Sequence, residues 1–127
     1  MEPFLMEKTM KKLLIMLFCG ALSCSVFAMT DKAKNELNRA LQGDYQALRN
    51  VAFSMKSGGA GHDQNPIAGC ALRKIILIVN QDQADSGDYG NEYVDCKALK
   101  PEESEQAWKM AVQLLPQVLQ LKAQSTK

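Results

Sequence analysis

Two cysteines outside the N-terminal 28 residues, Cys70 and Cys96, constrain the fold more than any other feature of the sequence. An even pair of cysteines in an exported protein most often forms a disulfide. Such a bond would close a loop of about 25 residues and stabilise the fold by about 3 kcal/mol in the chain-entropy description. A free structural thiol, a metal ligand and a catalytic thiol are the alternatives, and His62 is the single histidine that could assist either of the last two.

The N-terminus of the chain predicts export. Lys11 and Lys12 form a short positive segment, an apolar run over residues 13–22 follows, and Ala28 ends a small-residue exit. This is the pattern of a secretory signal peptide, and its apolar run is too short to span a membrane as a helix. We therefore interpret residues 1–28 as a signal peptide that leaves the mature chain.

Cleavage near Ala28 and Met29 would leave residues 29–127 as one helical domain in the periplasm or outside the cell. Met10 is an alternative start, because the nine residues before it add nothing to the signal peptide. Lipidation of Cys24 is an alternative to cleavage after Ala28, although the bulky residue before Cys24 stands one position later than a lipoprotein signal requires.

The charge of the mature chain is balanced. The full chain has 15 basic and 14 acidic residues, of which three and two lie in the signal peptide, so residues 29–127 carry 12 of each. Nucleic acids and anionic membranes attract proteins that have a basic face. We therefore expect neither nucleic-acid binding nor membrane insertion of the mature chain.

Helical periodicity predicts an all-α fold of about four helices. Apolar residues recur at helical spacing over residues 30–42, 45–56 and 67–79. Thr30 or Asp31 is the expected N-cap of the first helix, and Asp44 is that of the second. Asn65-Pro66 is the start signal of the third, a cap followed by proline at the first helical position. The run Ile75–Val79 could also form a buried strand, but the length of the segment that contains it favours a helix.

The C-terminal part of the chain predicts a long connection and a last helix. Residues 81–100 are rich in acids and are expected to form a loop that a disulfide would restrain. The last helix begins at Pro101, and Pro116 is expected to kink or divide it. Trp108 is expected to lie in the core of the protein.

One segment resembles a known repeat. Residues 40–52 read A-L-Q-G-D-Y-Q-A-L-R-N-V-A, which is similar to the opening A-x-x-G-D-x-x-A-x-x-N-L-G of the SEL-one-like repeat, a relative of the tetratricopeptide repeat. The resemblance covers about residues 40–76 as one degenerate copy, and its second half departs from the family, which has an aromatic pair there. The motif positions are Gly43, Asp44, Ala47, Asn50, Ala52, where the family usually has glycine, and Gly58, where the family ends its first helix.

The resemblance implies a helical hairpin whose neighbouring helices act as caps, because one such repeat cannot bury its own apolar face. It also implies an adaptor or scaffold that binds another protein. We expect contacts with such a partner through helix faces and through the acidic loop between Asp82 and Asp95, since exposed tyrosines are frequent interface anchors. The alternatives are that this segment is only a solvated acidic loop, and that its tyrosines cover the apolar helix over residues 67–79. The candidate contact residues are Asp85, Asp88, Tyr89, Glu92 and Tyr93.

The sequence contains no defensible catalytic or metal-binding pattern. The acids between Asp82 and Asp95 do not fit the spacing of an EF-hand calcium loop in any register. His62 has no nucleophile arranged around it and is expected to be a solvated loop residue. We therefore expect no enzyme activity, no metal and no cofactor.

The sequence thus favours a small exported interaction module of the cell envelope. An inhibitor or immunity-type protein that blocks a basic cell-wall hydrolase is the alternative, because the acidic loop could dock electrostatically.

Overall fold

The computed structural model describes residues 29–125, which form five α-helices and no strand. The all-α prediction is therefore confirmed, with one helix more than expected. The predicted signal peptide and its cleavage site at residues 1–28 lie outside the described residues. The helices are α2 (Asp31–Leu41), α3 (Tyr45–Ser57), α4 (Pro66–Val79), α5 (Ser86–Lys97) and α6 (Pro101–Ser125).

The first three helices begin where capping residues predict. The side chains of Thr30, Asp44 and Asn65 each accept a hydrogen bond from the backbone N–H three residues later, at 3.1, 2.8 and 3.0 Å. Each bond satisfies one of the N–H groups that a helix start leaves without an internal partner. Local sequence therefore fixes the N-termini of α2, α3 and α4.

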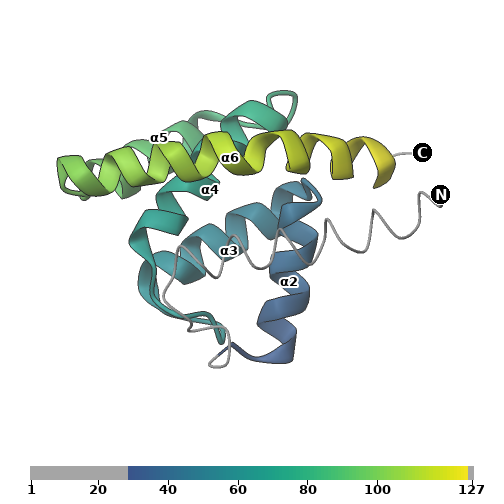
Figure 1. Cartoon of the computed structure of the whole chain (residues 1–127), viewed down its shortest axis with the longest axis horizontal. Helices are drawn as coiled ribbons and strands as arrows, with labels where there is room; N and C mark the ends of the chain where they lie inside the picture. Colours follow the sequence, from purple (N-terminus) through teal and green to yellow (C-terminus); the bar gives the residue numbers. More distant parts are fainter. Residues whose placement is uncertain (1–28, 126–127) are drawn as a thin grey trace.

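Helix α4 lies at the centre of the fold and packs against α3, α5 and α6. In Figure 1, α6 extends across the top of the view, and α4, α3 and α2 lie below it. The α4 side chains Leu72, Ile75 and Ile76 are completely buried, which explains why this segment is apolar on nearly every side. The helical interpretation of Ile75–Val79 is confirmed, and the strand alternative is wrong.

Two motif glycines have left-handed backbone conformations. Gly58 has a φ of 77° and terminates α3, and Gly43 has a φ of 82° in the turn between α2 and α3. A side chain is strained at a positive φ of this size. At Gly43 a Cβ atom would also come within 2.8 Å of Cβ of Lys122, so α6 packs closely over this turn.

The predicted disulfide is present. Cys70 of α4 and Cys96 of α5 are bonded, with their Cα atoms 5.1 Å apart. Cys70 is completely buried, and Cys96 is half-buried against the core. The bond therefore attaches α5 directly to the central helix.

The segment 81–100 is not the loop that its composition predicts, because residues 86–97 form α5. Asp85 and Asp88 make a capping box, in which each side chain accepts a hydrogen bond from the backbone N–H of the other at 3.1 Å. This reciprocal cap satisfies the start of the helix in a sequence that contains two glycines.

The last helix begins at Pro101 as predicted, but Pro116 does not divide it. Proline inside a helix removes one hydrogen bond and costs about 3 kcal/mol. Leu114 and Val118, on either side of Pro116, are both buried. Tertiary packing of the two flanking turns therefore outweighs the local cost.

Two further residues differ from their expected environments. Trp108 was expected in the core, but its side chain is 51% exposed. His62 was expected in solvent, but it is buried, and its Nε2 lies 3.3 Å from Oε1 of Glu36 in α2. The glycine-rich composition around His62 predicts a loop between two helices. It does not predict that α2 packs against His62.

Candidate interaction surface

Apart from the disulfide, helix α5 is attached to the rest of the protein mainly through charged groups. Among its 12 residues, all within the described part of the chain, the buried ones are Asp88 and Asp95. Two buried carboxylates on one helix require partners, because an unpaired buried charge is strongly unfavourable.

Asp95 lies between two cations from different helices. Its Oδ1 is 2.7 Å from Nζ of Lys56 in α3, and its Oδ2 is 3.0 Å from Nε of Arg73 in α4. Arg73 and Asp95 are both almost fully buried, whereas Lys56 remains partly exposed. Asp95 therefore ties α5 to both α3 and α4.

Asp88 forms a second contact with α3. Its Oδ2 accepts a hydrogen bond from the hydroxyl of Tyr45, and its Oδ1 lies 3.2 Å from Nε of Arg49. Burial by itself raises the pKa of Asp88, but the hydrogen bonds from the Tyr45 hydroxyl and the Asp85 N–H, together with nearby arginine charges, outweigh it and lower the pKa. The same hydrogen bond raises the pKa of Tyr45, which stays a neutral donor.

Lys74 of α4 connects α5 with α6. Its buried ammonium is 2.7 Å from Oε1 of Glu92 and lies 3.9 Å from the centre of the Trp108 ring. This geometry combines an ion pair with a cation–π contact. Glu92 and Trp108, which come from different helices, are therefore neighbours on either side of one lysine.

The acids of the predicted contact segment are thus used within the protein. Asp85 caps α5, and Asp88 and Glu92 bind cations of α3 and α4. The prediction that this segment is a solvated acidic loop is wrong. The segment is not solvated because four cations on α3 and α4 bind the carboxylates of α5. These cations are Arg49, Lys56, Arg73 and Lys74.

The two tyrosines of the segment face solvent. Tyr89 is 57% exposed and Tyr93 is 63% exposed, and four-residue spacing places them on one face of α5. At 3.6 residues per turn, the two tyrosines lie next to Cys96 and Glu92 around the helix and point away from Asp95. Trp108 of α6 is the neighbour of Glu92 across Lys74.

The ion pairs of α5 predict a specific pH dependence of stability. The pKa of Asp88 is lower in the folded chain than in the unfolded chain, so its carboxylate stabilises the fold above the unfolded pKa of about 4. This contribution is lost as the pH falls through the folded pKa. The difference in unfolding free energy between wild type and Asp88→Asn should therefore shrink below about pH 4. Urea unfolding of both proteins at pH 6, 4 and 3 measures this difference. A difference that stays the same at all three pH values would contradict the stabilisation of the Asp88 carboxylate in the folded chain.

The repeat-motif residues lie in α3 and at its ends, and most of them have structural roles. Ala47 and Ala52 are buried, Gly43 and Gly58 flank the helix, and Asp44 caps it. Asn50 is exposed and accepts a hydrogen bond at 2.9 Å from Nε2 of Gln46 on the same helix. The structure therefore does not bring the motif residues together with Tyr89 and Tyr93 in one site.

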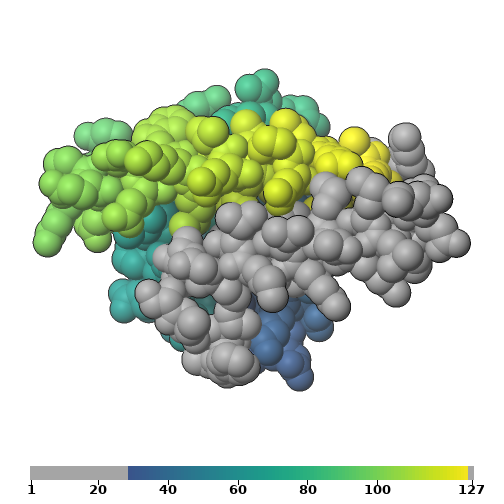
Figure 2. All heavy atoms as spheres, in the orientation of Figure 1, coloured from purple at the N-terminus to yellow at the C-terminus, as the bar shows by residue number. Residues whose placement is uncertain are grey.

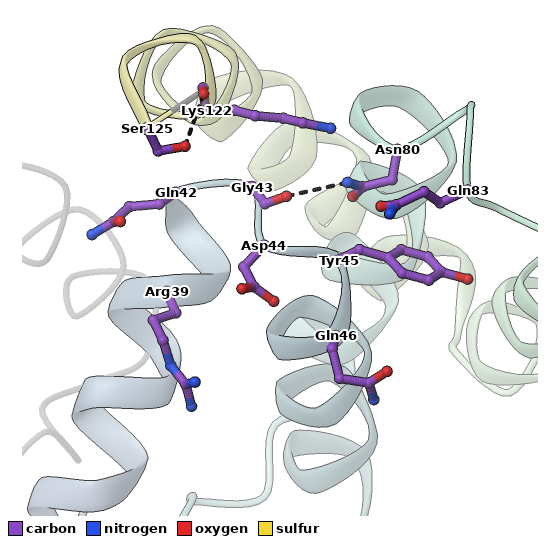
Figure 3. Close-up of a pocket in the computed structure, with 10 residues that line it drawn as sticks. All are labelled: Arg39, Gln42, Gly43, Asp44, Tyr45, Gln46, Asn80, Gln83, Lys122 and Ser125. Carbon is purple, nitrogen blue, oxygen red and sulfur yellow. Dashed lines mark hydrogen bonds between the residues drawn. The ribbon is translucent and has the colours of Figure 1, made fainter. Parts of the chain in front are cut away.

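A pocket of about 570 Å³ lies where the turn between α2 and α3 meets the ends of α4 and α6. Figure 3 shows its lining residues. The Nζ atom of Lys122 donates to the carbonyl of Val79 at 2.6 Å, and Nδ2 of Asn80 donates to the carbonyl of Gly43 at 3.1 Å. Arg39 points away from both groups in this view, so the polar side chains do not converge on one ligand position.

Two other kinds of site were sought in residues 29–125. No cluster of three or more histidine, cysteine, aspartate or glutamate side chains is placed to hold a metal ion there. None of the helices in this range has both the length and the apolar character needed to cross a bilayer.

No protein-family model, curated protein or solved structure matches this chain.

The spacing of charged residues in the sequence contains one signal for the contacts of α5, which composition alone does not reveal. Arg73 and Lys74 stand in an otherwise apolar helix, and buried cations require carboxylates. Asp88, Glu92 and Asp95 follow at intervals of four and three residues, which is the spacing of one helix face. Matching these two patterns would have predicted both α5 and its orientation.

Proposed function

We propose that this is a small exported helical-repeat protein that binds another protein in the cell envelope, as an adaptor or scaffold. The observation that supports the proposal most directly is the pair of exposed tyrosines, Tyr89 and Tyr93, on a helix whose carboxylates are engaged internally. Tyrosines combine a large apolar area with a polar hydroxyl and have few rotatable bonds, which suits them to anchor an interface.

Rigidity of α5 adds to this argument. The disulfide and the ion pairs fix α5 to α4 and α3 at several points along its length. A partner that binds the tyrosines would therefore meet a preorganised surface and would lose little conformational entropy in ordering it. The SEL-one-like resemblance is in accord with such a role, since helical-repeat proteins commonly act through binding surfaces.

The surface also defines the chemistry of the partner. Asp88 and Asp95 are buried, and Glu92 is bound to Lys74, so α5 offers little negative charge to a basic protein. We expect a partner that presents apolar and hydrogen-bonding groups to the tyrosine rings. The inhibitor hypothesis depended on a free acidic loop, and no specific observation now favours it.

Replacing Tyr89 and Tyr93 together with alanine should abolish partner binding without unfolding the chain. An interface anchor of this type contributes about 2 kcal/mol or more, which corresponds to about a 30-fold loss of affinity for each tyrosine. The measurement is quantitative affinity capture from envelope extract under non-reducing conditions, with tagged wild type and variant purified after export.

Phe53→Ala provides the matched control, because Phe53 is an exposed aromatic residue on α3. A protein that is retained by wild type and by Phe53→Ala, but lost from the tyrosine variant, is the expected result. Equal retention by all three proteins, or no retention by wild type, would contradict the proposal. Circular dichroism verifies that the variants stay folded.

A further inference from the structure

Helix α5 differs from the other four described helices in what lies beneath it. The buried apolar side chains of the core all belong to α2, α3, α4 and α6. The face of α4 under α5 carries Arg73 and Lys74, which bind carboxylates of α5 and lie within one turn of Cys70. Helix α5 packs mainly against α4, and Figure 2 shows parts of it at the surface behind α6.

Detaching α5 would expose charged groups more than apolar ones. The charged side chains buried between α4 and α5 are at most 6% exposed, and they are Arg73, Lys74, Asp88 and Asp95. Opening would return each of them to water, and the regained hydration offsets much of the ion-pair attraction that is lost. The packing of α2 with α3, of α3 with α4 and of α4 with α6 does not involve α5, so the apolar core would remain.

The sequence of α5 gives the helix little stability of its own. A helix of 12 residues is marginal in water without tertiary contacts. Gly87 and Gly90 weaken it further, because glycine is among the poorest helix formers. A Cβ atom on Gly90 would meet nothing within 4 Å outside its own helix, so no contact in the described chain requires glycine there. Once detached, residues 86–97 should therefore lose their helical structure.

The disulfide is the covalent attachment that holds α5 on the central helix. Its two cysteines differ in access, because Cys70 is completely buried whereas Cys96 is half-buried. A small thiol can therefore approach the bond from the side of Cys96. Cleavage of this bond would leave α5 with the ion pairs alone.

A dithiol cleaves such a bond by thiol–disulfide exchange. One thiolate of the dithiol attacks Sγ of Cys96, the bond between the two cysteines breaks, and Cys70 leaves with the electron pair and takes up a proton. The second thiolate of the dithiol then displaces Cys96, which also takes up a proton. Two electrons pass to the two cysteines, and the dithiol becomes a disulfide.

We propose that the Cys70–Cys96 bond is a redox switch for the tyrosine surface, which Tyr89 and Tyr93 form. In the oxidised protein, α5 is fixed and presents the two tyrosines at a constant spacing. In the protein reduced by a dithiol, residues 81–100 become a mobile loop and the tyrosine surface is lost, while the other four helices stay packed. The effect on partner binding rests on the proposed function, whereas the release of α5 does not.

Hydrogen exchange on the exported protein, before and after reduction with dithiothreitol, tests the release. Amides of Ser86–Lys97 should exchange at least about 10-fold faster after reduction, while those of α3 and α4 stay protected. Reoxidation in air should restore the slow exchange. Cys70→Ala with Cys96→Ala is the matched control, because dithiothreitol should leave its exchange unchanged. Amides of α5 that stay protected after reduction would overturn the proposal, as would equal loss of protection throughout the chain or exchange that reoxidation does not slow.

Affinity capture distinguishes the switch from the proposed function. The partner that oxidised wild type retains should bind the double alanine variant, which cannot form the bond, at least about 10-fold more weakly, because an unfolded segment must first be ordered. Equal affinity of the two proteins would overturn the switch. Oxidised wild type that retains no partner would contradict the proposed function, and hydrogen exchange alone would then decide whether reduction releases α5.

Discussion

Replacing both Cys70 and Cys96 with alanine should lower the free energy of unfolding by about 3 kcal/mol and loosen α5 from the fold. The disulfide spans 26 residues and joins α5 to the central helix. Helix α5 contributes no fully buried apolar side chain within the described chain, so hydrophobic burial cannot replace the lost bond. Its remaining attachments are ion pairs, which salt and acid weaken.

Urea unfolding and hydrogen exchange measure the two parts of this expectation. Trp108 is the single tryptophan of the chain, and Lys74 links it to Glu92, so its fluorescence should also report the release of α5. Amides of α5 should exchange faster in the variant, while those of α3 and α4 change less. A loss below about 1 kcal/mol, with α5 amides as protected as in wild type, would contradict this role of the disulfide.

Asp95→Ala should destabilise the protein by about 3–5 kcal/mol, the range observed when one member of a buried ion pair is removed. The reason lies in Arg73, whose side chain is 5% exposed and whose guanidinium would lose its carboxylate partner. Lys56 can turn toward solvent because it is partly exposed, so most of the effect should arise from Arg73.

Two variants make this expectation specific. Arg73→Met combined with Asp95→Leu should recover much of the lost stability, since replacing a whole buried ion pair with apolar residues is often nearly neutral. Glu105→Gln, which removes an exposed pair with Lys109, should leave the urea midpoint unchanged. A mild effect of Asp95→Ala, or no recovery in the double variant, would show that Arg73 does not depend on Asp95.

The parts of the fold that were predictable depend on local signals. The caps Thr30, Asp44 and Asn65 and the apolar periodicity of α2, α3 and α4 are determined by neighbours in the sequence. The disulfide followed from there being one cysteine pair outside the expected signal peptide. These features need no knowledge of the tertiary structure.

The parts that were missed depend on contacts between distant segments. Helix α5 lacks an apolar stripe, because its inner face consists of Asp88, Glu92 and Asp95 paired with cations of α3 and α4. Its composition therefore resembles that of a loop. The apolar periodicity of the last helix assigns Trp108 to the core, whereas the small residues Ala107 and Ala111 make the close contact with the core. Single-residue tendencies cannot separate the buried apolar residues of α6 from its exposed ones.

The candidate surface was predictable in part. Tyr89 and Tyr93 were singled out from their spacing and are exposed, as a contact site requires. The acids beside them were assigned to the same surface, but tertiary ion pairs hold Asp88 and Glu92 within the protein, and Asp85 caps the helix. The chemistry expected of the partner changes accordingly, from basic to apolar.

Hydrogen exchange on the captured complex is the most direct measurement of whether α5 is the binding surface. Binding through Tyr89 and Tyr93 predicts slower amide exchange across Ser86–Lys97 in the complex than in the free protein, with Asp31–Leu41 of α2 unchanged. Protection confined to α2, with exchange in α5 unaltered, would contradict binding through the tyrosine surface.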